Sequence, residues 1–327
     1  MHAPLQKHQH HNEGYASKNG HCIHPYKNKK IWRNGDLVSW DECNVHSLTH
    51  TLHYGVGVFE GVRAYNTENG PAIFRVKEHT ERLFEAAKIV NIDIPYSIEE
   101  IIEAQKTVLL KNDFDEAYIR PIIYLGNESL GLRAEDLSVN VIIAAWEWPS
   151  YMDPESKQKG ISVVKSPYKQ YKNPNWSNYK ITGTYVNSIV ALQDAVAKGA
   201  DEALILDNDG YISEGSGENI FFLKDGLIMT PTTKNCLNGI TRQSVIDIAK
   251  DLGHKVEEGD WSYEHIIECD EAFFTGTAVE VTPITKIDEK IISNGTVGPI
   301  TKEIQINYEN AVFGTDNNSR NWLTYIE

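Results

Sequence analysis

The chain has 327 residues, 41% of them hydrophobic and 24% charged, which is the composition of a globular protein with one large or two ordinary domains. Its 46 acidic residues outnumber its 31 basic ones, and the formal net charge of −15 argues against a nucleic-acid or anionic-membrane partner. No apolar run approaches the roughly 20 residues of a membrane span. Four cysteines lie far apart, without the spacing of zinc or redox motifs, and are expected to be reduced thiols of a cytoplasmic protein without a metal site: Cys22, Cys43, Cys236 and Cys269.

Residues 1–29 are rich in histidine, lysine, asparagine and glycine, and little in them could pack into a core. The histidines are His2, His8, His10, His11, His21 and His24. They could form a metal-binding tract, but a flexible extension or an expression tag is the simpler interpretation. The stretch also lacks the apolar core of a secretory signal.

A first α+β domain is predicted over residues 30–148. Asn34 and Gly35 form a turn signal between two short apolar-rich runs, which predicts a hairpin over residues 31–40. A helix is expected to begin at Ser97, whose side chain can cap it while Glu100 reaches back. Periodicity predicts another helix and four strands: the helix at 78–91 and the strands at 58–65, 72–76, 117–125 and 139–148.

Residues 149–158 are rich in Pro, Ser and Asp and are the best candidate for an interdomain linker. A second, larger α+β domain is predicted over residues 159–327. Its expected helices are 184–198, 240–252 and 302–313, and its expected strands are 161–165, 203–207, 210–213, 219–223, 227–230, 271–274 and 280–284. Antiparallel hairpins with helices between them favour an α+β fold over a doubly wound sheet.

One lysine, Lys180, is surrounded in the sequence by the partners that pyridoxal phosphate requires. The cofactor's aldehyde needs an amine whose pKa a pocket can lower, and its ring nitrogen needs a carboxylate such as Glu214 to stay protonated. Its phenolic oxygen needs a donor, for which Tyr185 is a candidate, and its phosphate needs the free N–H groups of a helix start at residues 239–241. Taken singly, each of these residues is more often a surface charge or a plain helix cap.

Five stretches occur together in the chain: residues 50–63, 117–121, 211–219, 239–242 and 275–283. In this order they resemble the bacterial branched-chain-amino-acid aminotransferases, which are fold-type IV pyridoxal phosphate enzymes, and the similarity begins near Ile31. The resemblance implies a two-domain α+β fold like that of D-amino-acid aminotransferase. It also implies reversible transamination of leucine, isoleucine or valine with 2-oxoglutarate, in a homodimer or higher assembly with shared active sites.

The resemblance assigns a cofactor role to nine residues, with Lys180 as the catalytic amine that also moves the α-proton. They are Arg82, Lys180, Tyr185, Glu214, Leu237, Gly239, Ile240, Thr241 and Thr277. Arg82 would bind the phosphate, and its forked donors suit a dianion, although most such arginines are exposed helix charges. Asn238 stands where the family often has proline, which changes a loop and not the chemistry.

A second set is implied for the substrate. Phe59, Gly61, Arg63, Tyr118, Arg120, Thr277 and Ala278 would come from one chain, and Tyr54 and Leu132 from the other subunit. One pocket must hold an apolar branched side chain in one half-reaction and the acid of glutamate in the other, and a movable Arg120 or Tyr118 would serve both. Without the resemblance, the aromatic residues of 50–63 would be interpreted as strand packing and 275–283 as a tight turn.

Three alternatives stay open. A D-amino-acid aminotransferase and an aminodeoxychorismate lyase share the lysine and glutamate, but neither is expected to combine the two signatures at residues 50–63 and 117–121. A non-catalytic α+β binding protein with remnant motifs is the alternative from another class.

Overall fold

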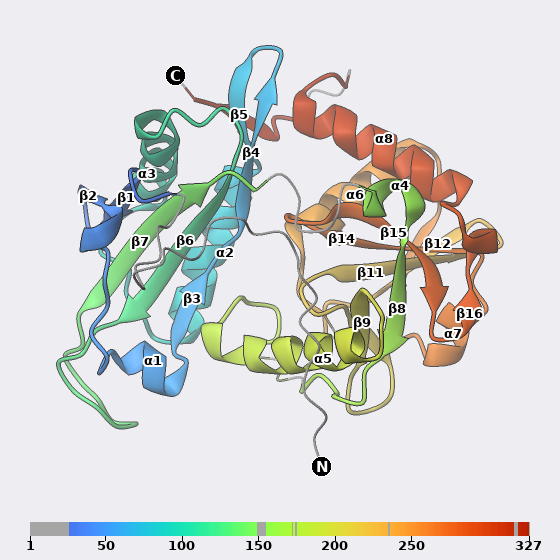
Figure 1. Cartoon of the computed structure of the whole chain (residues 1–327), viewed down its shortest axis with the longest axis horizontal. Helices are drawn as coiled ribbons and strands as arrows, with labels where there is room; N and C mark the ends of the chain where they lie inside the picture. Colours follow the sequence, from blue (N-terminus) through green and yellow to red (C-terminus); the bar gives the residue numbers. More distant parts are fainter. Residues whose placement is uncertain are drawn as a thin grey trace, which may run out of the picture.

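A computed structural model describes residues 26–148, 155–171, 173, 175–234, 236–316 and 320–326. The chain forms two sheets side by side, each with its own helices, and α5 (Tyr185–Ala197) runs beneath the gap between them (Figure 1). The predicted extension at residues 1–29 and linker at 149–158 lie largely outside the described residues. None of the helices in the described ranges combines the length and the hydrophobicity needed to cross a membrane.

The first sheet, as far as the structure describes it, has eight strands in the order β17-β5-β4-β6-β7-β1-β2, with β3 paired to β6. Seven come from the first half of the chain: β1 (Lys30–Arg33), β2 (Asp36–Ser39), β3 (Gly57–Phe59), β4 (Val62–Thr67), β5 (Gly70–Phe74), β6 (Ala117–Leu125) and β7 (Val139–Trp146). The hairpin is confirmed, because Asn34 and Gly35 both have positive φ, as a tight turn that follows the twist of its strands requires. The strand predicted over 58–65 is broken at Glu60, and β3 and β4 both pair with β6.

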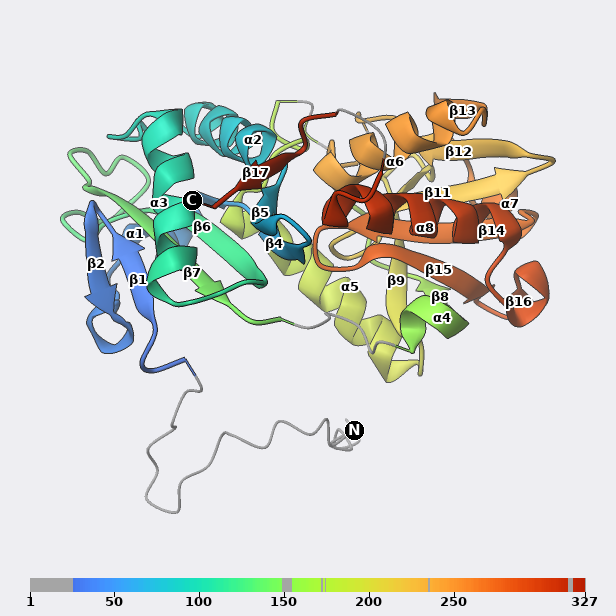
Figure 2. The ribbon, with the colours of Figure 1, turned by 90° about the horizontal axis from the view of Figure 1, so that it is seen from above.

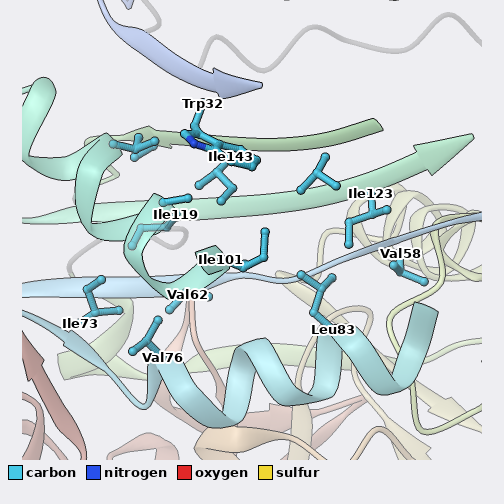
Figure 3. Close-up of a cluster of buried hydrophobic side chains, with 14 of the residues drawn as sticks. Trp32, Val58, Val62, Ile73, Val76, Leu83, Ile101, Ile119, Ile123 and Ile143 are labelled. Atoms are coloured by element: carbon cyan, nitrogen blue, oxygen red, sulfur yellow. The ribbon is translucent and has the colours of Figure 1, made fainter. Parts of the chain in front are cut away.

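Two helices cover one face of this sheet, α2 (Val76–Ile89) and α3 (Ile98–Lys111). Ser97 caps α3 as predicted, since its hydroxyl accepts from the Glu100 N–H while the Glu100 carboxylate accepts from the Ser97 N–H. Figure 3 shows the core between these two helices and the sheet, in which Leu83 and Ile101 of the helices face Ile119 and Ile123 of β6. This core fixes α2, and with it Arg82, against the sheet.

The second sheet has nine described strands in the order β10-β9-β8-β15-β14-β11-β12-β13, with β16 paired to β15. They are β8 (Ile161–Lys165), β9 (Glu202–Leu206), β10 (Ile212–Glu214), β11 (Asn219–Lys224), β12 (Leu227–Pro231), β13 (Val256–Gly259), β14 (Glu271–Gly276), β15 (Glu280–Ile287) and β16 (Lys290–Ile291). Helices α6 (Ile240–Asp251) and α8 (Pro299–Phe313) cover one face, and α7 (Tyr263–Ile267) packs its buried Ile266 into the core on the other face. The α+β class is confirmed.

The C-terminal strand β17 (Leu323–Tyr325) leaves the second half of the chain and pairs with β5 of the first sheet (Figure 2). The division at residues 148 and 159 stays a prediction, and β17 is the described element that crosses it. The sequence reasoning did not predict β13, β16, β17, α7, α1 (His50–Tyr54) or α4 (Ser156–Lys159). All are five residues or shorter, too short for a hydrophobic period to register.

Backbone contacts hold the Lys180 loop against the first sheet. The carbonyl of Lys180 accepts from the Phe59 N–H at 3.1 Å, and Val58 and Ile181 form an isolated antiparallel bridge. The carbonyl of Gly55 accepts from the Gly183 N–H at 2.9 Å. The lysine, although it belongs to the second half of the chain, is therefore fixed between the two sheets.

Candidate active site

Lys180, Tyr185 and Phe59 form the centre of the site. Lys180 Nζ donates to Tyr185 Oη at 2.7 Å. The rings of Phe59 and Tyr185 pack edge to face with centroids 4.8 Å apart, and Lys180 Nζ lies 5.2 Å from the Phe59 ring centre. An amine and a phenol placed in this way can exchange a proton directly.

Burial on its own lowers the pKa of Lys180, but the Tyr185 phenol and the Glu60 carboxylate raise it, and the pKa ends above its ordinary value. The sequence reasoning expected a pocket that lowers this pKa. The expectation is wrong for the chain alone, because the nearby Arg82 guanidinium only partly offsets the negative groups.

Glu214 lies at the end of β10 and faces a small cavity of about 40 Å³ that also touches Tyr185 and Leu237. Its Oε1 accepts from Gln170 Nε2 at 3.1 Å, and its Oε2 accepts from the Leu237 N–H at 3.0 Å. These two hydrogen bonds hold the Glu214 carboxylate beside the cavity.

The N-terminus of α6 forms one wall of a cavity of about 70 Å³. Gly239 is required there, because a Cβ at this position would lie 2.0 Å from Asn219 Oδ1. Thr241, Thr277 and Thr275 line the same cavity, and within the described residues the buried Thr275 Oγ1 has no hydrogen-bond partner. The N–H groups of a helix start, which have no partner within the helix, and an unused hydroxyl make a binding site for an anion.

Arg82 reaches this cavity from α2 and is held by a buried carboxylate that the sequence reasoning did not single out. Arg82 Nε and Nη2 donate to the two oxygens of Glu60 at 2.6 and 2.9 Å, and Nη1 donates to the Asn238 carbonyl at 2.7 Å. Glu60 also lies 2.8 Å from His79 Nδ1. Burial alone would raise the pKa of Glu60, but Arg82 and His79 hold it well below its ordinary value.

The wall opposite Lys180 is aromatic and carries one arginine. Arg120 lies over the rings of Phe59, Tyr118 and Trp146 at 4.9 to 5.9 Å, and its Nη2 donates to Tyr118 Oη at 3.2 Å. Trp148 packs edge to face on Tyr118. Among the described residues, the buried Arg120 Nε has no partner, so this guanidinium retains a donor.

Most of the predicted site residues converge on three adjoining cavities. The largest, of about 200 Å³, is lined by Phe59, Tyr118, Arg120, Lys180, Tyr185 and Ala278. The cavity at α6 adds Gly61, Arg82, Leu237, Gly239, Ile240, Thr241 and Thr277, and the smallest adds Glu214. Their roles stay predictions, but the chain brings them to one place.

Three predicted substrate residues do not reach these cavities. Arg63 donates to Glu116 at 2.7 Å and lies 3.4 Å from Glu280 on another side of β4. Tyr54 and Leu132 are 40% and 90% exposed and lie beside each other, since Tyr54 Oη accepts from the N–H of Gly131. Their role in the site of a neighbouring subunit stays a prediction.

Two buried carboxyls lie at the cavity wall: Glu218 lines the cavity, and Glu202 lies behind it. They are hydrogen-bonded to each other, and Ser216 donates to Glu202 at 2.9 Å. Burial, and then the neighbouring Glu202, raise the pKa of Glu218 well above its ordinary value. Two carboxyls in contact cannot both ionise without strong repulsion, so the pair holds a proton.

Several lining residues were not predicted from the sequence, for identifiable reasons. Glu218 and Thr275 fall inside the resembling stretches, and buried polar residues next to glycines were the available signal. Gln170, Trp148 and Ile189 carry no motif of their own and reach the cavities only through tertiary folding. Within the described part of the chain, no group of three His, Cys, Asp or Glu side chains could hold a metal ion.

A lysine among a carboxylate, a phenol and an anion-binding helix start defines an enzyme that works through a phosphate-bearing aldehyde cofactor. Residues 57–287 match the family model described as amino-transferase class IV. The chain is 49% identical to the branched-chain-amino-acid aminotransferase of Pseudomonas aeruginosa over 298 residues, which cover 91% of this chain and 97% of that one. The chain therefore belongs to the class IV aminotransferases and is an aminotransferase.

Solved structures agree with this assignment. A crystal structure of Escherichia coli branched-chain amino acid aminotransferase superposes with a TM-score of 0.90 at 39% identity, covering 92% of this chain and 100% of that one. The branched-chain amino acid aminotransferase from Thermobaculum terrenum, solved in its holo-form with PLP (pyridoxal phosphate), superposes with a TM-score of 0.84 at 30% identity, covering 92% and 99%. The predicted family and fold are confirmed.

Proposed function

We propose that the chain transfers the amino group of leucine, isoleucine or valine to 2-oxoglutarate, reversibly and with pyridoxal phosphate as cofactor. The observation that carries the proposal is the Lys180 amine, hydrogen-bonded to Tyr185 in a cavity whose far wall combines aromatic rings with Arg120. The relatives named for this activity, which match over nine-tenths of the chain, support the substrate class.

The residues present fit the cofactor. The unpartnered Thr275 hydroxyl, the glycine-dependent opening at Gly239 and the N-terminus of α6 make a cradle of phosphate size and sign. Arg82 still has N–H groups beyond those bound to Glu60 and Asn238. Glu214 would hold the ring nitrogen and Leu237 would pack on the ring. When bound, the cofactor draws electrons from the substrate's α-carbon and so makes its proton acidic.

Lys180 would hold the cofactor and then carry the α-proton as a base. Tyr185 is 2.7 Å from Lys180 Nζ and can exchange that proton. Such positioned proton transfer contributes about 10²- to 10⁴-fold to the rate of a reaction. The Glu60 carboxylate and the Arg82 guanidinium form a buried ion pair beside the site, and their burial keeps both charges out of contact with water.

The substrate side of the cavity serves two different side chains. Phe59, Tyr118 and Ile189 supply apolar surface for a branched chain. Arg120, with an unused Nε, supplies a cation for the second carboxylate of glutamate. The turn at Thr277 and Ala278 would hold the α-carboxylate through its backbone N–H groups. Arg63 is left without a direct substrate contact in this geometry, because Glu116 and Glu280 occupy it.

A homodimer or a higher homo-oligomer completes the site. Tyr54 and Leu132, exposed beside each other, would close a neighbour's cavity. The nearby Leu52 and Leu130 are 63% and 46% exposed and extend this apolar surface. The acidic net charge argues against nucleic-acid or membrane partners, and the free thiols of Cys43, Cys236 and Cys269 support a cytoplasmic location.

The direct test is a visible spectrum of the protein loaded with pyridoxal phosphate. L-leucine should bleach the cofactor band of the lysine-bound form, and 2-oxoglutarate should restore it, because each reagent runs one half-reaction. Bleaching by D-alanine and not by L-leucine would replace the proposal with the D-specific alternative. Absence of any cofactor band would contradict it altogether.

Lys180→Ala is the matched variant for the same spectrum. It should bind the cofactor without the lysine-bound band and lose about 10⁴-fold or more in turnover, because both the covalent tether and the base are removed. Undiminished turnover would eliminate Lys180 as the catalytic amine.

A further inference from the structure

Two side-chain amides connect α5 to the carboxylate of Glu214. Asn187, two residues after Tyr185, donates from Nδ2 to Gln170 Oε1 at 3.0 Å. Gln170 in turn donates from Nε2 to Glu214 Oε1 at 3.1 Å. The Gln170 backbone is itself anchored, because its N–H donates to the Leu206 carbonyl at 2.8 Å at the end of β9.

The hydrogen bonds of these three side chains run in one direction, from Asn187 through Gln170 to Glu214. An amide presents a donor on one side and an acceptor on the other, and a carboxylate only accepts. Asn187 binds the oxygen of Gln170, and this contact turns the NH₂ group of Gln170 toward Glu214. Without that contact, the Gln170 amide could rotate and present its oxygen to the carboxylate, which would repel it.

We propose that Asn187 and Gln170 form an amide relay that aims the Glu214 carboxylate at the pyridine nitrogen of the cofactor and thereby keeps that nitrogen protonated. The proposal rests on the proposed function, because it names positioning residues for the same site. Neither residue lies in the stretches that carry the family resemblance. Asn187 lies one helical turn or less from Tyr185, so one helix orients both ends of the cofactor ring.

A purely structural role would leave the ring nitrogen unaffected. Gln305 provides the comparison, since it is also a half-buried amide and its Nε2 donates to the carbonyls of Lys157 and Val281, remote from Glu214. Gln305→Met should lower stability as Gln170→Met does, without any effect on the cofactor.

The experiment is ¹⁵N NMR of the protein loaded with pyridoxal phosphate labelled at the ring nitrogen, recorded from pH 6 to pH 10 in steps of about one unit. In the wild type, the signal should remain that of a protonated nitrogen through neutral pH. In Gln170→Met, the Glu214 carboxylate should lose its aim at the ring nitrogen and so its hydrogen bond to the protonated form. The midpoint of deprotonation of the ring nitrogen should then fall by about one pH unit, because a hydrogen bond to a charged group is worth about a tenfold change or more. Gln305→Met should titrate as the wild type does.

Asn187→Asp tests the direction of the relay without changing Gln170 or Glu214. The aspartate can only accept, so it should rotate the Gln170 amide and present the amide oxygen to Glu214. The midpoint should then fall as in Gln170→Met. A negative charge acting through space alone would raise the midpoint instead, so the sign separates the two causes.

The double variant tests whether the effect of Asn187 acts through Gln170. In a Gln170→Met background, Asn187→Asp should lower the midpoint no further, whereas independent effects would add. An unchanged midpoint in Gln170→Met, or a raised one in Asn187→Asp, would overturn the relay. Failure of the proposed function would differ, since the wild type itself would then bind no cofactor. Thermal unfolding of each unloaded variant reports any loss of fold separately.

Discussion

Two regions are built differently: the cavities around Lys180, called here the inner end, and the exposed surface at Tyr54 and Leu132 that would face a neighbour's cavity, called the outer end. At the inner end, Lys180, Glu214 and Arg82 are each hydrogen-bonded to other groups of the same chain, at 2.6 to 3.1 Å. At the outer end, Tyr54 is 40% exposed and Leu132 is 90% exposed. One end is preorganised within a single chain and the other is open.

This difference separates chemistry from substrate choice. Groups that hold a cofactor must be rigid, because rates depend on orientation within fractions of an ångström. Groups that contact the side chain of a substrate can come from a neighbour, because apolar contact is not directional. The inner end should therefore depend on buried charges and the outer end on assembly.

Glu60→Ala should have the largest effect, a loss of folding stability at the inner end. It leaves Arg82 buried without its carboxylate partner, and breaking such a pair usually costs about 3 to 5 kcal/mol. Urea unfolding would measure the loss. Glu78→Ala is the control on the same helix, since the Glu78 side chain is 34% exposed and its pair with Arg75 should contribute at most about 1 kcal/mol. Equal losses in the two variants would contradict a preorganised inner end.

The pH dependence of the Glu60 variant has a definite sign. Arg82 and His79 hold the pKa of Glu60 below its ordinary value of about 4.3, despite burial. The carboxylate therefore contributes stability above that pH, which is lost as the pH falls further toward the lowered pKa. The difference in free energy of unfolding between the wild type and Glu60→Ala should decrease below about pH 4.

The sequence was sufficient for elements that carry a local signal of period, turn or cap. Strands β6 and β8 have the predicted limits, and α3 begins at its predicted cap, because period and capping are local signals. The break at Glu60 was not predictable from period. Its cause is tertiary, since the Glu60 side chain turns inward to Arg82 and His79.

The site could be predicted where residues share a motif. Glu214 stands in a resembling stretch, Lys180 and Tyr185 are five residues apart, and the chain brings the three to two adjoining cavities. Arg63 shares a stretch with Phe59, yet it binds Glu116 and Glu280, because the break at Glu60 ends β3 at Phe59 and puts Arg63 on the separate strand β4. Gln170 has no motif, and only the fold brings it to Glu214.

Leu132→Ala tests the outer end and should have an intermediate effect. A side chain 90% exposed in the chain should add little to its folding, whereas burial in a neighbour's cavity should stabilise substrate by about 1.5 to 3 kcal/mol. We expect kcat/KM for L-leucine to fall about tenfold or more, with unchanged thermal unfolding. Ile291→Ala, at an apolar residue 53% exposed on β16, should change neither. An unaltered kcat/KM in Leu132→Ala would place that loop outside the site.

Glu218→Gln should have the smallest effect, and that effect should be a gain in stability. Burial and Glu202 raise the pKa of Glu218, so its stabilising neutral form is present at low pH and is lost as the pH rises through that raised pKa. The variant should be more stable than the wild type at pH 8, on the order of 1 kcal/mol, and equal to it near pH 4. Glu289→Gln, whose side chain is 98% exposed, is the control in the same thermal unfolding series.

A gain in stability from Glu218→Gln would show that the inner end is not optimised for folding alone. The wall behind Lys180 would then hold a strained acid pair that a neutral residue relieves, as expected where a site is maintained at some expense of stability. A loss of stability at pH 8 would mean instead that the Glu202 and Glu218 pair shares its proton through a strong hydrogen bond. In that case the inner end would be preorganised down to its last buried carboxyl, and the contrast with the exposed Tyr54 and Leu132 would be sharper still.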